Sequence, residues 1–504
     1  MLRTLTRFVL DGMPLVRQRC SCLWRGRIAL LVGVGIVGGI LNTPLGWAQP
    51  SDRPHIVLVM ADDQGWGETG YNGHPLLKTP HLDAMANHGL RLDRFYAGAP
   101  VCSPTRAAVL TGRTNDRTGV ESHGYALRRQ EITVSKLLRD AGYVTGHFGK
   151  WHLNGLRGPG VPILDSDSHH PGKFGFDHWL SVTNFFDRDP LLSRRGKFED
   201  FEGDSSEIVV DEAIDFIARQ SRAGLASFTV IWFGTPHSPF KAVAEDMVDF
   251  QDLDESSMNH YGELVAMDRS IGTLRLGLRE LGIAEDTLLW YCSDNGGLPK
   301  IKPDTTGGLR GNKGKIFEGG LRVPAIIEWP AVITQSRITE TPACVMDIAA
   351  TLLDITGVAH PAPDRPADGI SLLPLIQGDD RPRRQPIGFR FGRASAMNFG
   401  DGIKLVSEDG DPAHLQMYDL KADPYETTDL SGQHAEELAK RTKVWSDWMQ
   451  SVDDSFAGKD YPERKVDPSE PEPRWWDETD LYQTFLPQFR ERWEYQSWLK
   501  RKKR

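Results

Sequence analysis

Oxygen-bearing side chains follow two stretches that have the composition of buried strands. Asp62 and Asp63 come after one apolar run, and Asp294 and Asn295 come after another. Carboxylates that are brought together repel one another unless a cation neutralises them. A set of oxygen ligands suits a hard divalent ion, Ca²⁺ or Mg²⁺, better than zinc. Asp62 and Asp63 alone are more typical of a helix cap or a solvated turn, but the four residues together predict a metal site.

A cysteine lies in a short constrained segment with a cation nearby. The segment Cys102–Arg106 reads CSPTR, so a proline follows the cysteine by two residues and an arginine follows it by four. A buried structural cysteine is the usual explanation of such a residue. The spacing alone is therefore a modest indication of a reactive centre, and the surrounding sequence has to decide between the two interpretations.

The elements that would position these residues alternate between short apolar runs and helical patterns. Buried strands are expected at 55–60, 144–148, 228–233 and 287–292, and helices at 133–141 and 263–281. This alternation is typical of an α/β fold. Polar and ionisable residues cluster just past the carboxyl ends of the strands, which is the edge where ligands bind in open α/β sheets.

The composition is that of a globular enzyme. Of the 504 residues, 39% are hydrophobic and 25% are charged, which excludes a wholly disordered, collagen-like or multi-span membrane chain. The net charge of -10 argues against a general nucleic-acid binder, so no nucleic-acid partner is expected. Any anionic ligand must be held by a local positive site. The cysteines have no zinc-ligand spacing and are too few for a disulfide framework.

The first 48 residues have the pattern of a secretory signal. Arginines precede the apolar run 28–41, and the segment Gly46–Ala48 supplies small residues at a cleavage site. We expect residues 1–48 to be a signal peptide and the protein to be exported to the periplasm or the extracellular space, with no stable membrane span after cleavage. The alternative is an uncleaved N-terminal anchor, although the apolar run is short for a membrane span.

Three regions are expected after the leader. Residues 52–387 are predicted to form the main, catalytic domain, and residues 388–458 a smaller α+β subdomain. Residues 459–504 begin as a linker rich in proline and charge and end in an aromatic and basic tail. The tail either docks on the main domain through its aromatic residues or contacts a polyanion or a membrane surface.

The surroundings of Cys102 resemble the signature of the type I sulfatases, a family of the alkaline phosphatase superfamily. The resemblance covers Cys102–Arg113 and continues, in the family's order, from about residue 54 to 450. Further matching stretches are Asp62–Gly67, Gly142–Leu153, Pro236–Phe240, Ser293–Gly297, Leu309–Gly314 with Glu318–Pro324, and Tyr418–Leu420 with Asp423–Glu426. The resemblance implies a large mixed, mostly parallel sheet flanked by helices, alkaline phosphatase-like, with a smaller C-terminal α+β subdomain.

The resemblance also implies the reactive group and the metal. In this family the cysteine is oxidised after translation to formylglycine, so Cys102 would be converted by a formylglycine-generating maturation enzyme. One hydroxyl of the hydrated aldehyde attacks sulfur, and deprotonation of the other expels sulfate. An unmodified Cys102 lacks the second hydroxyl, so the unmodified enzyme should be nearly inactive. The family favours one Ca²⁺ over Mg²⁺, with residue 102 completing the shell of Asp62, Asp63, Asp294 and Asn295.

The resemblance assigns roles to five further residues. Arg106 orients the formylglycine hydrate, and Lys150 and Lys313 contact the sulfate oxygens. His152 acts as the base in the elimination step, and His237 protonates the leaving oxygen with Lys313 as a possible helper. Each of these residues taken alone would be an ordinary core or surface residue, but their motif context favours catalysis.

The sequence therefore predicts a sulfuric ester hydrolase that releases inorganic sulfate from sulfated carbohydrate or aryl sulfate esters. The alternatives are a phosphate or phosphonate ester hydrolase of the same superfamily and a non-catalytic protein that binds sulfated glycans. Substrate selection is expected from the loops 153–178 and 184–207. Within the second loop, Arg194 and Arg195 either contact a second anionic group of the substrate or form a solvated basic turn.

Overall fold

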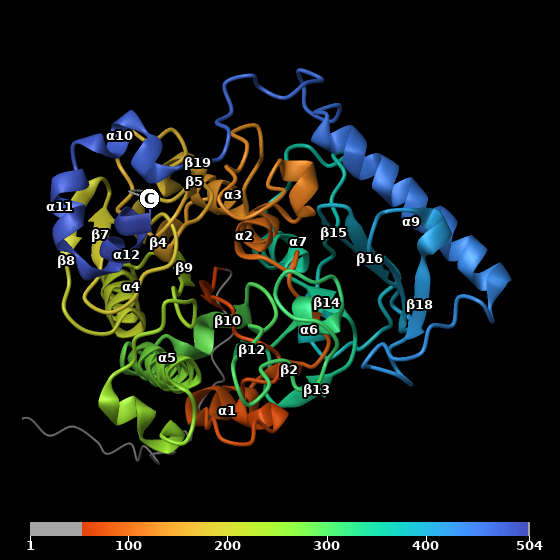
Figure 1. Cartoon of the computed structure of the whole chain (residues 1–504), viewed down its shortest axis with the longest axis horizontal. Coiled ribbons are helices and arrows are strands. Elements are labelled where there is room, and N and C mark those ends of the chain that lie inside the picture. The colour runs from red at the N-terminus through yellow and green to blue at the C-terminus, as the bar shows by residue number, and fades with distance from the viewer. Residues whose placement is uncertain (1–52, 502–504) are drawn as a thin grey trace, which may run out of the picture. The chain divides into compact units, whose positions relative to one another are not determined.

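A ten-stranded sheet forms the centre of the computed structural model, which describes residues 53–501 (Figure 1). Its order is β13-β2-β12-β10-β1-β9-β4-β6-β7-β8. The five central strands, from β10 to β6, are parallel, whereas most outer strands join antiparallel. The strands are β1 (His55–Ala61), β2 (Leu90–Leu92), β4 (Val144–Lys150), β6 (His178–Val182), β7 (Leu191–Arg194), β8 (Lys197–Asp200), β9 (Ser227–Trp232), β10 (Thr287–Ser293), β12 (Ala325–Glu328) and β13 (Arg337–Thr339). The predicted mixed, mostly parallel sheet is confirmed.

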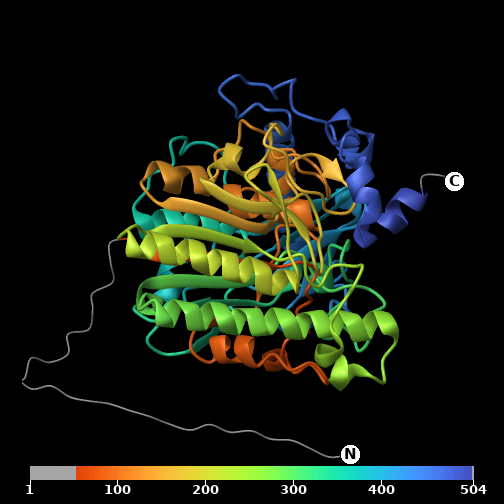
Figure 2. The same ribbon diagram turned by 90° about the vertical axis from the view of Figure 1, so that its left-hand side faces the viewer.

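Helices cover both faces of this sheet. On one face lie α1 (Pro80–Ala86), α4 (Ser205–Arg222) and α5 (Glu255–Glu280), and Figure 2 shows α4 and α5 running beside one another. On the other face lie α2 (Cys102–Thr111), α3 (Val134–Asp140) and α7 (Met346–Thr356). Alternate residues of β1 enter the two cores, Val57 and Val59 one of them and Ile56 and Leu58 the other. This double burial explains why β1 is an unbroken apolar run.

Two elements are longer than the sequence pattern predicts. Helix α5 begins at Glu255 and not near Glu263, because the Asp254 side chain caps it by accepting hydrogen bonds from the next N–H groups. Its first turns are too polar to show an apolar stripe. Strand β4 continues to Lys150, which pairs with Val182 of β6. Lys150 is therefore the last residue of a strand.

A second, four-stranded antiparallel sheet forms the C-terminal subdomain. It contains β15 (Ile387–Phe391), β16 (Ala394–Asn398), β17 (Ile403–Ser407) and β18 (Gln416–Asp419). Helix α9 (Ala435–Phe456) covers it, with Trp445 packed against Met397, Leu405 and Met417. Smaller elements are β3 (Phe95–Tyr96), β11 (Arg322–Val323) and β14 (Ala343–Cys344), which form a three-stranded sheet, and the short helices α6 (Glu318–Leu321) and α8 (Leu373–Ile376).

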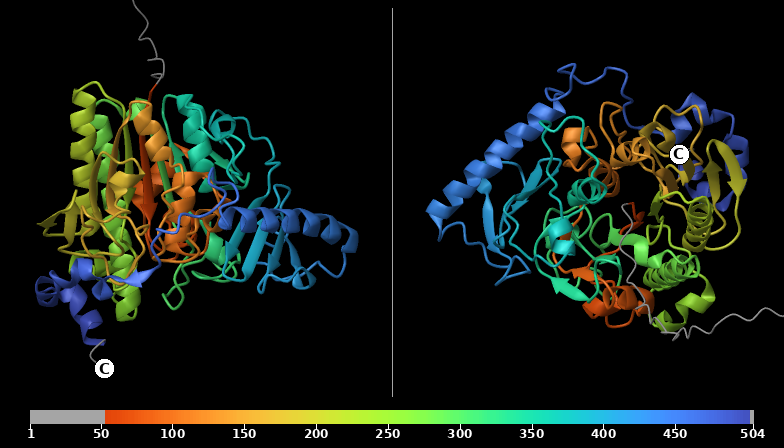
Figure 3. Two further views of the ribbon diagram at one scale, coloured as in Figure 1. Left: turned by 90° about the horizontal axis from the view of Figure 1, so that it is seen from above. Right: turned by 180° about the vertical axis from the view of Figure 1, so that it is seen from behind.

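The chain after α9 returns to the main sheet. Strand β19 (Arg474–Trp475) pairs with β5 (Leu156–Arg157), and α10 (Asp480–Gln483), α11 (Leu486–Glu491) and α12 (Trp493–Arg501) follow. Aromatic residues of this segment pack on the loop after β4 and on β7. The packed residues are Leu156, Val161, Leu164, Leu191, Trp476, Tyr482, Phe489 and Tyr495. The tail is therefore docked, and the left view of Figure 3 shows it, in dark blue, at the end of the sheet opposite the start of β1.

The leader lies outside the described residues, as do residues 502–504 of the basic tail. The signal peptide, its cleavage and the anchor alternative consequently stay predictions. Between residues 53 and 501, none of the helices combines the length and the apolar composition needed to cross a membrane.

Candidate active site

The carboxyl ends of four parallel strands deliver most of the predicted site residues to one place. Asp62 and Asp63 follow β1, and Asp294 and Asn295 follow its neighbour β10. Lys150 ends β4, while the chain after β9, on the other side of β1, leads to His237. Adjacent parallel strands end at the same edge of a sheet, so residues far apart in the sequence meet there.

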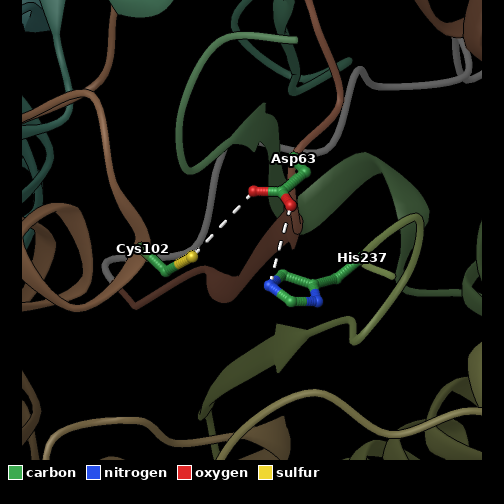
Figure 4. Close-up of side chains that lie close together, drawn as sticks. All are labelled: Asp63, Cys102 and His237. Carbon is green, nitrogen blue, oxygen red and sulfur yellow. Dashed lines mark hydrogen bonds and ion pairs between the residues drawn. The ribbon is translucent and has the colours of Figure 1, made fainter. Parts of the chain in front are cut away.

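Cys102 faces this edge from the first residue of helix α2. Its Sγ lies 3.4 Å from Oδ1 of Asp62 and 4.0 Å from Oδ1 of Asp63. Figure 4 shows Asp63 between Cys102 and His237. The ligand atoms of Asp62, Asp63, Cys102 and Asp294 all lie within 4.8 Å of one another. The helix N-terminus adds a partial positive charge, which favours anions beside Cys102.

Three cations neutralise the three buried carboxylates. Lys150 Nζ lies 2.6 Å from Asp62 Oδ2, and Lys313 Nζ lies 2.7 Å from Asp63 Oδ2. The Arg106 guanidinium donates to Asp294 Oδ2 at 2.6 Å. Burial raises the pKa values of Asp62 and Asp63, but the neighbouring cations, led by Lys150 for Asp62 and Lys313 for Asp63, outweigh it and hold both below the ordinary value.

The residues present fit a hard divalent cation. The donor set consists of carboxylate oxygens and one amide, which is the chemistry that Ca²⁺ and Mg²⁺ prefer. Asn295 donates through Nδ2 to Asp63 Oδ1 at 2.8 Å, and its buried Oδ1 has no hydrogen-bond partner among the described residues. An unpaired buried acceptor is costly, and a cation would satisfy it. Asp63 also has a positive φ of 74°, a strained backbone of the kind found at ligand sites.

The two predicted histidines lie at the same edge and are neutral. His237 contacts the Ser238 carbonyl oxygen through Nδ1 at 2.6 Å, so Nδ1 carries the proton, and Nε2 lies 3.8 Å from Asp63 Oδ2 (Figure 4). Burial and the charge of Lys313 lower the pKa of His237 to about 4. Burial and Lys150 hold the pKa of His152 well below its usual value, and neither of its ring nitrogens has a hydrogen-bond partner in the described chain.

A cavity of about 500 Å³ opens above these groups. Its lining includes Cys102, His152, His237 and Lys313, which the sequence predicts. Other lining residues were not predicted as site residues from the sequence, among them His123, Arg157, Asn184, Phe185, Trp475, Glu494 and Trp498. Arg157, Asn184 and Phe185 fall in the loops expected to select substrate. Trp475 and Trp498 belong to the aromatic tail, whose composition was the available signal, whereas nothing in the sequence singles out His123.

Arg194, one of two arginines that could contact a second anionic group of the substrate, does not face the cavity. Its guanidinium binds Glu199 and Glu212, each at 2.8 Å, and it is not among the residues that line the cavity. The Arg194 guanidinium is thus already paired with two carboxylates of the same chain and is not placed to bind an anionic group of the substrate.

Comparisons with known proteins agree with this geometry. The sulfatase family model matches residues 54–358, and a model described as N-sulphoglucosamine sulphohydrolase, C-terminal, matches residues 311–448. The N-acetylgalactosamine-6-sulfatase of Canis lupus familiaris is 32% identical over 399 residues, which cover 71% of this chain and 72% of that protein. Arylsulfatase A of Homo sapiens is 31% identical over 442 residues, with coverages of 75% and 83%.

Solved structures share the fold. The crystal structure of Ps i-CgsB has a TM-score of 0.73 at 23% identity, over 86% of this chain and 97% of that chain. A phosphonate monoester hydrolase of Agrobacterium radiobacter has a TM-score of 0.57 at 19% identity, over 84% and 100%. The fold is thus alkaline phosphatase-like, and the sequence relatives are named sulfatases. The chain belongs to the type I sulfatase family and is a sulfate ester hydrolase.

Proposed function

We propose that this sulfatase is an exported enzyme that releases inorganic sulfate from sulfated carbohydrate or aryl sulfate esters. Cys102 would be converted to formylglycine by a maturation enzyme, and one Ca²⁺ would lie beside it. The observation that carries the proposal is the convergence of Cys102 with Asp62, Asp63 and Asp294 within 4.8 Å. A buried cysteine without a reactive role has no need of three carboxylates around it.

The unmodified thiol is poorly suited to attack an ester. Burial and the charge of Asp294 raise the pKa of Cys102 well above its usual value, so the thiol keeps its proton. The thiolate is the nucleophilic form of cysteine, and it is scarce here. A hydrated formylglycine supplies an oxygen nucleophile for sulfur and a second hydroxyl through which sulfate is released.

The charges of the site suit an anionic ester. Asp62, Asp63, Asp294 and Asn295 would hold the calcium ion, which supplies positive charge for the sulfate oxygens. The three carboxylates already balance Arg106, Lys150 and Lys313, so a bound divalent ion would leave the site with an excess of two positive charges. Lys150 and Lys313 are then available to bind the sulfate oxygens, and Arg106 orients residue 102.

The histidines can move protons at defined atoms. Nδ1 of the neutral His237 ring holds its proton against the Ser238 carbonyl oxygen, so Nε2 has a free lone pair. Nε2 would therefore have to take up a proton first, and the resulting imidazolium, beside Asp63, would pass that proton to the leaving oxygen. His152 is neutral, and its ring nitrogens have no partner within residues 53–501, so it can accept a proton when sulfate is released.

The relatives support a carbohydrate substrate. Several curated relatives are named N-acetylgalactosamine-6-sulfatase. Ps i-CgsB is described in complex with k-i-k-neocarrahexaose, and another solved structure, with a TM-score of 0.65, in complex with its substrate D-glucosamine-2-N,6-O-disulfate. The cavity of about 500 Å³ lies in the usual range for small-molecule sites.

Mass spectrometry of the Cys102 peptide, paired with sulfate release, tests the proposal. Protein from the native source should carry the aldehyde at residue 102 and release sulfate, and Cys102→Ala should abolish release. Cys292→Ala is the matched control, because Cys292 is also 2% exposed but lies within β10. Chelation should remove activity, and Ca²⁺ should restore it better than Mg²⁺.

Three results would contradict the proposal. Full activity with only the free thiol at residue 102 would exclude a formylglycine mechanism. A preference for aryl phosphate mono- or diesters over the matching aryl sulfate, by orders of magnitude, would favour the phosphate or phosphonate alternative. Binding of sulfated glycans by matured enzyme without any sulfate release would favour the non-catalytic alternative.

A further inference from the structure

We propose that the C-terminal segment 474–498 forms one wall of a second sugar site in the active-site cavity. Trp475 and Trp498 would stack on the pyranose ring next to the sulfated one, and Glu494 would accept its hydroxyl groups. The inference rests on the proposed function, since it concerns which esters the cavity selects. It adds to that function a substrate-recognition element, residues 474–498, that is separate from the catalytic residues.

The two tryptophans form an aromatic surface inside the cavity. Their ring centroids lie 4.7 Å apart at an interplanar angle of 43°, and both line the cavity that contains Cys102 and His237. Both side chains are half-buried. A pyranose ring has an apolar C–H face and a polar edge, so it can pack its face on an aromatic ring while its hydroxyl groups bond elsewhere. A paired indole surface beside polar groups matches that shape.

Polar groups for the edge of the ring are present. Glu494 lines the same cavity, and its Oε1 pairs with Arg492. Its buried Oε2 has no hydrogen-bond partner in the described part of the chain. A carboxylate oxygen in that position calls for a donor, and a sugar hydroxyl is such a donor, whereas a simple aryl ring is not. Arg157, stacked 5.4 Å over Tyr125, adds a cation on the same lining.

The wall is fixed in place before any ligand binds. Trp475 pairs with Arg157 in the β19–β5 ladder, and Tyr495 OH donates to the Gly160 carbonyl oxygen at 2.7 Å. Between them the buried Trp476 lies so close to Gly158 that a Cβ at residue 158 would be 2.8 Å from its Nε1. Surfaces that are ordered in advance lose less entropy on binding. The segment is therefore suited to recognition and not to closing as a lid.

The wall also lies outside the parts of the chain that define the family. The two family models end at residues 358 and 448, whereas the wall is formed by residues 474–498. The catalytic groups come from residues 62–313. A recognition element that is separate from the reacting groups can set specificity without disturbing the chemistry.

The test compares Trp498→Ala and Trp475→Ala with Trp493→Ala. Trp493 lies on α12, as Trp498 does, and its side chain is 37% exposed. Lys241 lies over its ring, and Trp493 does not line the cavity that contains Cys102. Trp493→Ala is therefore the matched control. The substrates are 4-nitrophenyl sulfate, which has one ring, and sulfated chondroitin and carrageenan oligosaccharides. For the best oligosaccharide, Trp498→Ala should lower the ratio of its kcat/KM to that of the aryl sulfate by about tenfold, mainly through KM.

Each outcome decides the proposal. An unchanged ratio in Trp498→Ala and Trp475→Ala would overturn it, as would an equal loss in Trp493→Ala. If Trp498→Ala misfolds, Trp498→Phe is measured in its place; it keeps an aromatic ring and should retain most of the preference for the oligosaccharide.

If the wild-type enzyme releases no sulfate from any ester, the proposed function fails. Calorimetric titration of Cys102→Ala with the same oligosaccharides then tests the wall. Binding that Trp498→Ala weakens about tenfold would support the wall, and no binding would refute it.

Discussion

Opposite charges of three buried carboxylates and three cations meet beside residue 102, and only Lys313 among them is appreciably exposed. The side chains of Asp62, Lys150 and Arg106 are fully buried, and their contacts are as short as 2.6 Å. Buried charges are tolerated only when they are paired, and removal of one partner leaves the other at a large cost. Substitutions here will therefore change folding as well as chemistry, and ligand binding has to be measured beside activity.

Calcium should stabilise the wild-type protein, and Asn295→Ala should lose most of that effect. A ligand that binds only the folded state adds about 3 kcal/mol when its free concentration is about a hundred times Kd. The measurement is the rise in Tm between chelator and excess Ca²⁺. Asn398→Ala is the control, because Asn398 is an equally buried asparagine on β16, away from the site. A full calcium-dependent rise in Asn295→Ala would exclude the amide oxygen as a ligand.

Two buried acidic residues, Asp187 in the loop after β6 and Glu263 on α5, make stability depend on pH. Burial raises the pKa of Asp187 to about 7, and burial together with Asp187 raises the pKa of Glu263 well above its usual value. A carboxyl group with a raised folded-state pKa stabilises the fold at low pH, and that stabilisation is lost as the pH rises from about 4 to about 7. For Asp187 the loss is at most about 4 kcal/mol.

Asp187→Asn should remove the part of this pH dependence that comes from Asp187. The variant keeps the side-chain oxygen that accepts from the Arg188 N–H, so it should match the wild type at pH 5 and be more stable at pH 8. Urea unfolding at the two pH values measures the difference. An equal difference at both pH values would show that the Asp187 carboxyl does not titrate between pH 5 and pH 8 in the folded protein, which would contradict its raised pKa.

Strand ends explain why much of the site could be predicted from the sequence. The apolar runs before Asp62 and Asp294 identify two buried strands, and parallel neighbours bring their carboxyl ends together. The start of α2 at Cys102 is less apparent, because the proline after Ser103 is typical of a turn as well as of a first helical turn. The extension of β4 to Lys150 depends on pairing with β6, which no local pattern records.

Gly149→Ala should displace Lys150 and impair the enzyme. Gly149 has a φ of +101°, and a Cβ there would lie 2.0 Å from the Trp232 carbonyl oxygen of the adjacent strand. The backbone would have to move, and Lys150 with it, so both Tm and kcat should fall. Gly432→Ala is the control, since a Cβ at residue 432 meets no atom within 4 Å. Normal kcat in Gly149→Ala would mean that β4 tolerates the shift.

A buried ion cluster connects the small C-terminal sheet to the segment that carries Lys313. Lys404 of β17 lies 3.0 Å from Glu318 Oε1 and 2.9 Å from Glu426 Oε1. All three side chains are at most 1% exposed. The subdomain is thus held to the main sheet by charges that neither part could leave unpaired.

Lys404→Met should lower the free energy of unfolding by about 3–5 kcal/mol, because two buried carboxylates lose their cation. Denaturant unfolding measures the loss. Lys440→Met, an exposed lysine on α9, is the control and should be close to neutral. The triple variant Lys404→Met, Glu318→Gln, Glu426→Gln should recover part of the stability, and a failure of Lys404→Met to destabilise would show that the cluster is not a fixed ion pair.

Contacts between distant segments are what the sequence could not predict. The tail's aromatic residues indicate docking, but the β5–β19 pairing and the place of Trp475 and Trp498 in the cavity depend on the path of residues 459–474. That path is set by contacts such as the Glu470 carboxylate with His169, at 2.9 Å. Such pairs have no periodicity and no fixed spacing, so only the folded chain displays them.

The burial of Cys102 has a consequence for the order of events in the cell. Its side chain is 2% exposed and lies beside strand ends and loops that come from residues as far along the chain as Lys313. The proposed conversion of Cys102 to formylglycine requires a maturation enzyme to reach this side chain, and the folded chain leaves almost none of it accessible. Under that proposal the conversion would precede folding, and a chain that folded with the thiol would keep it.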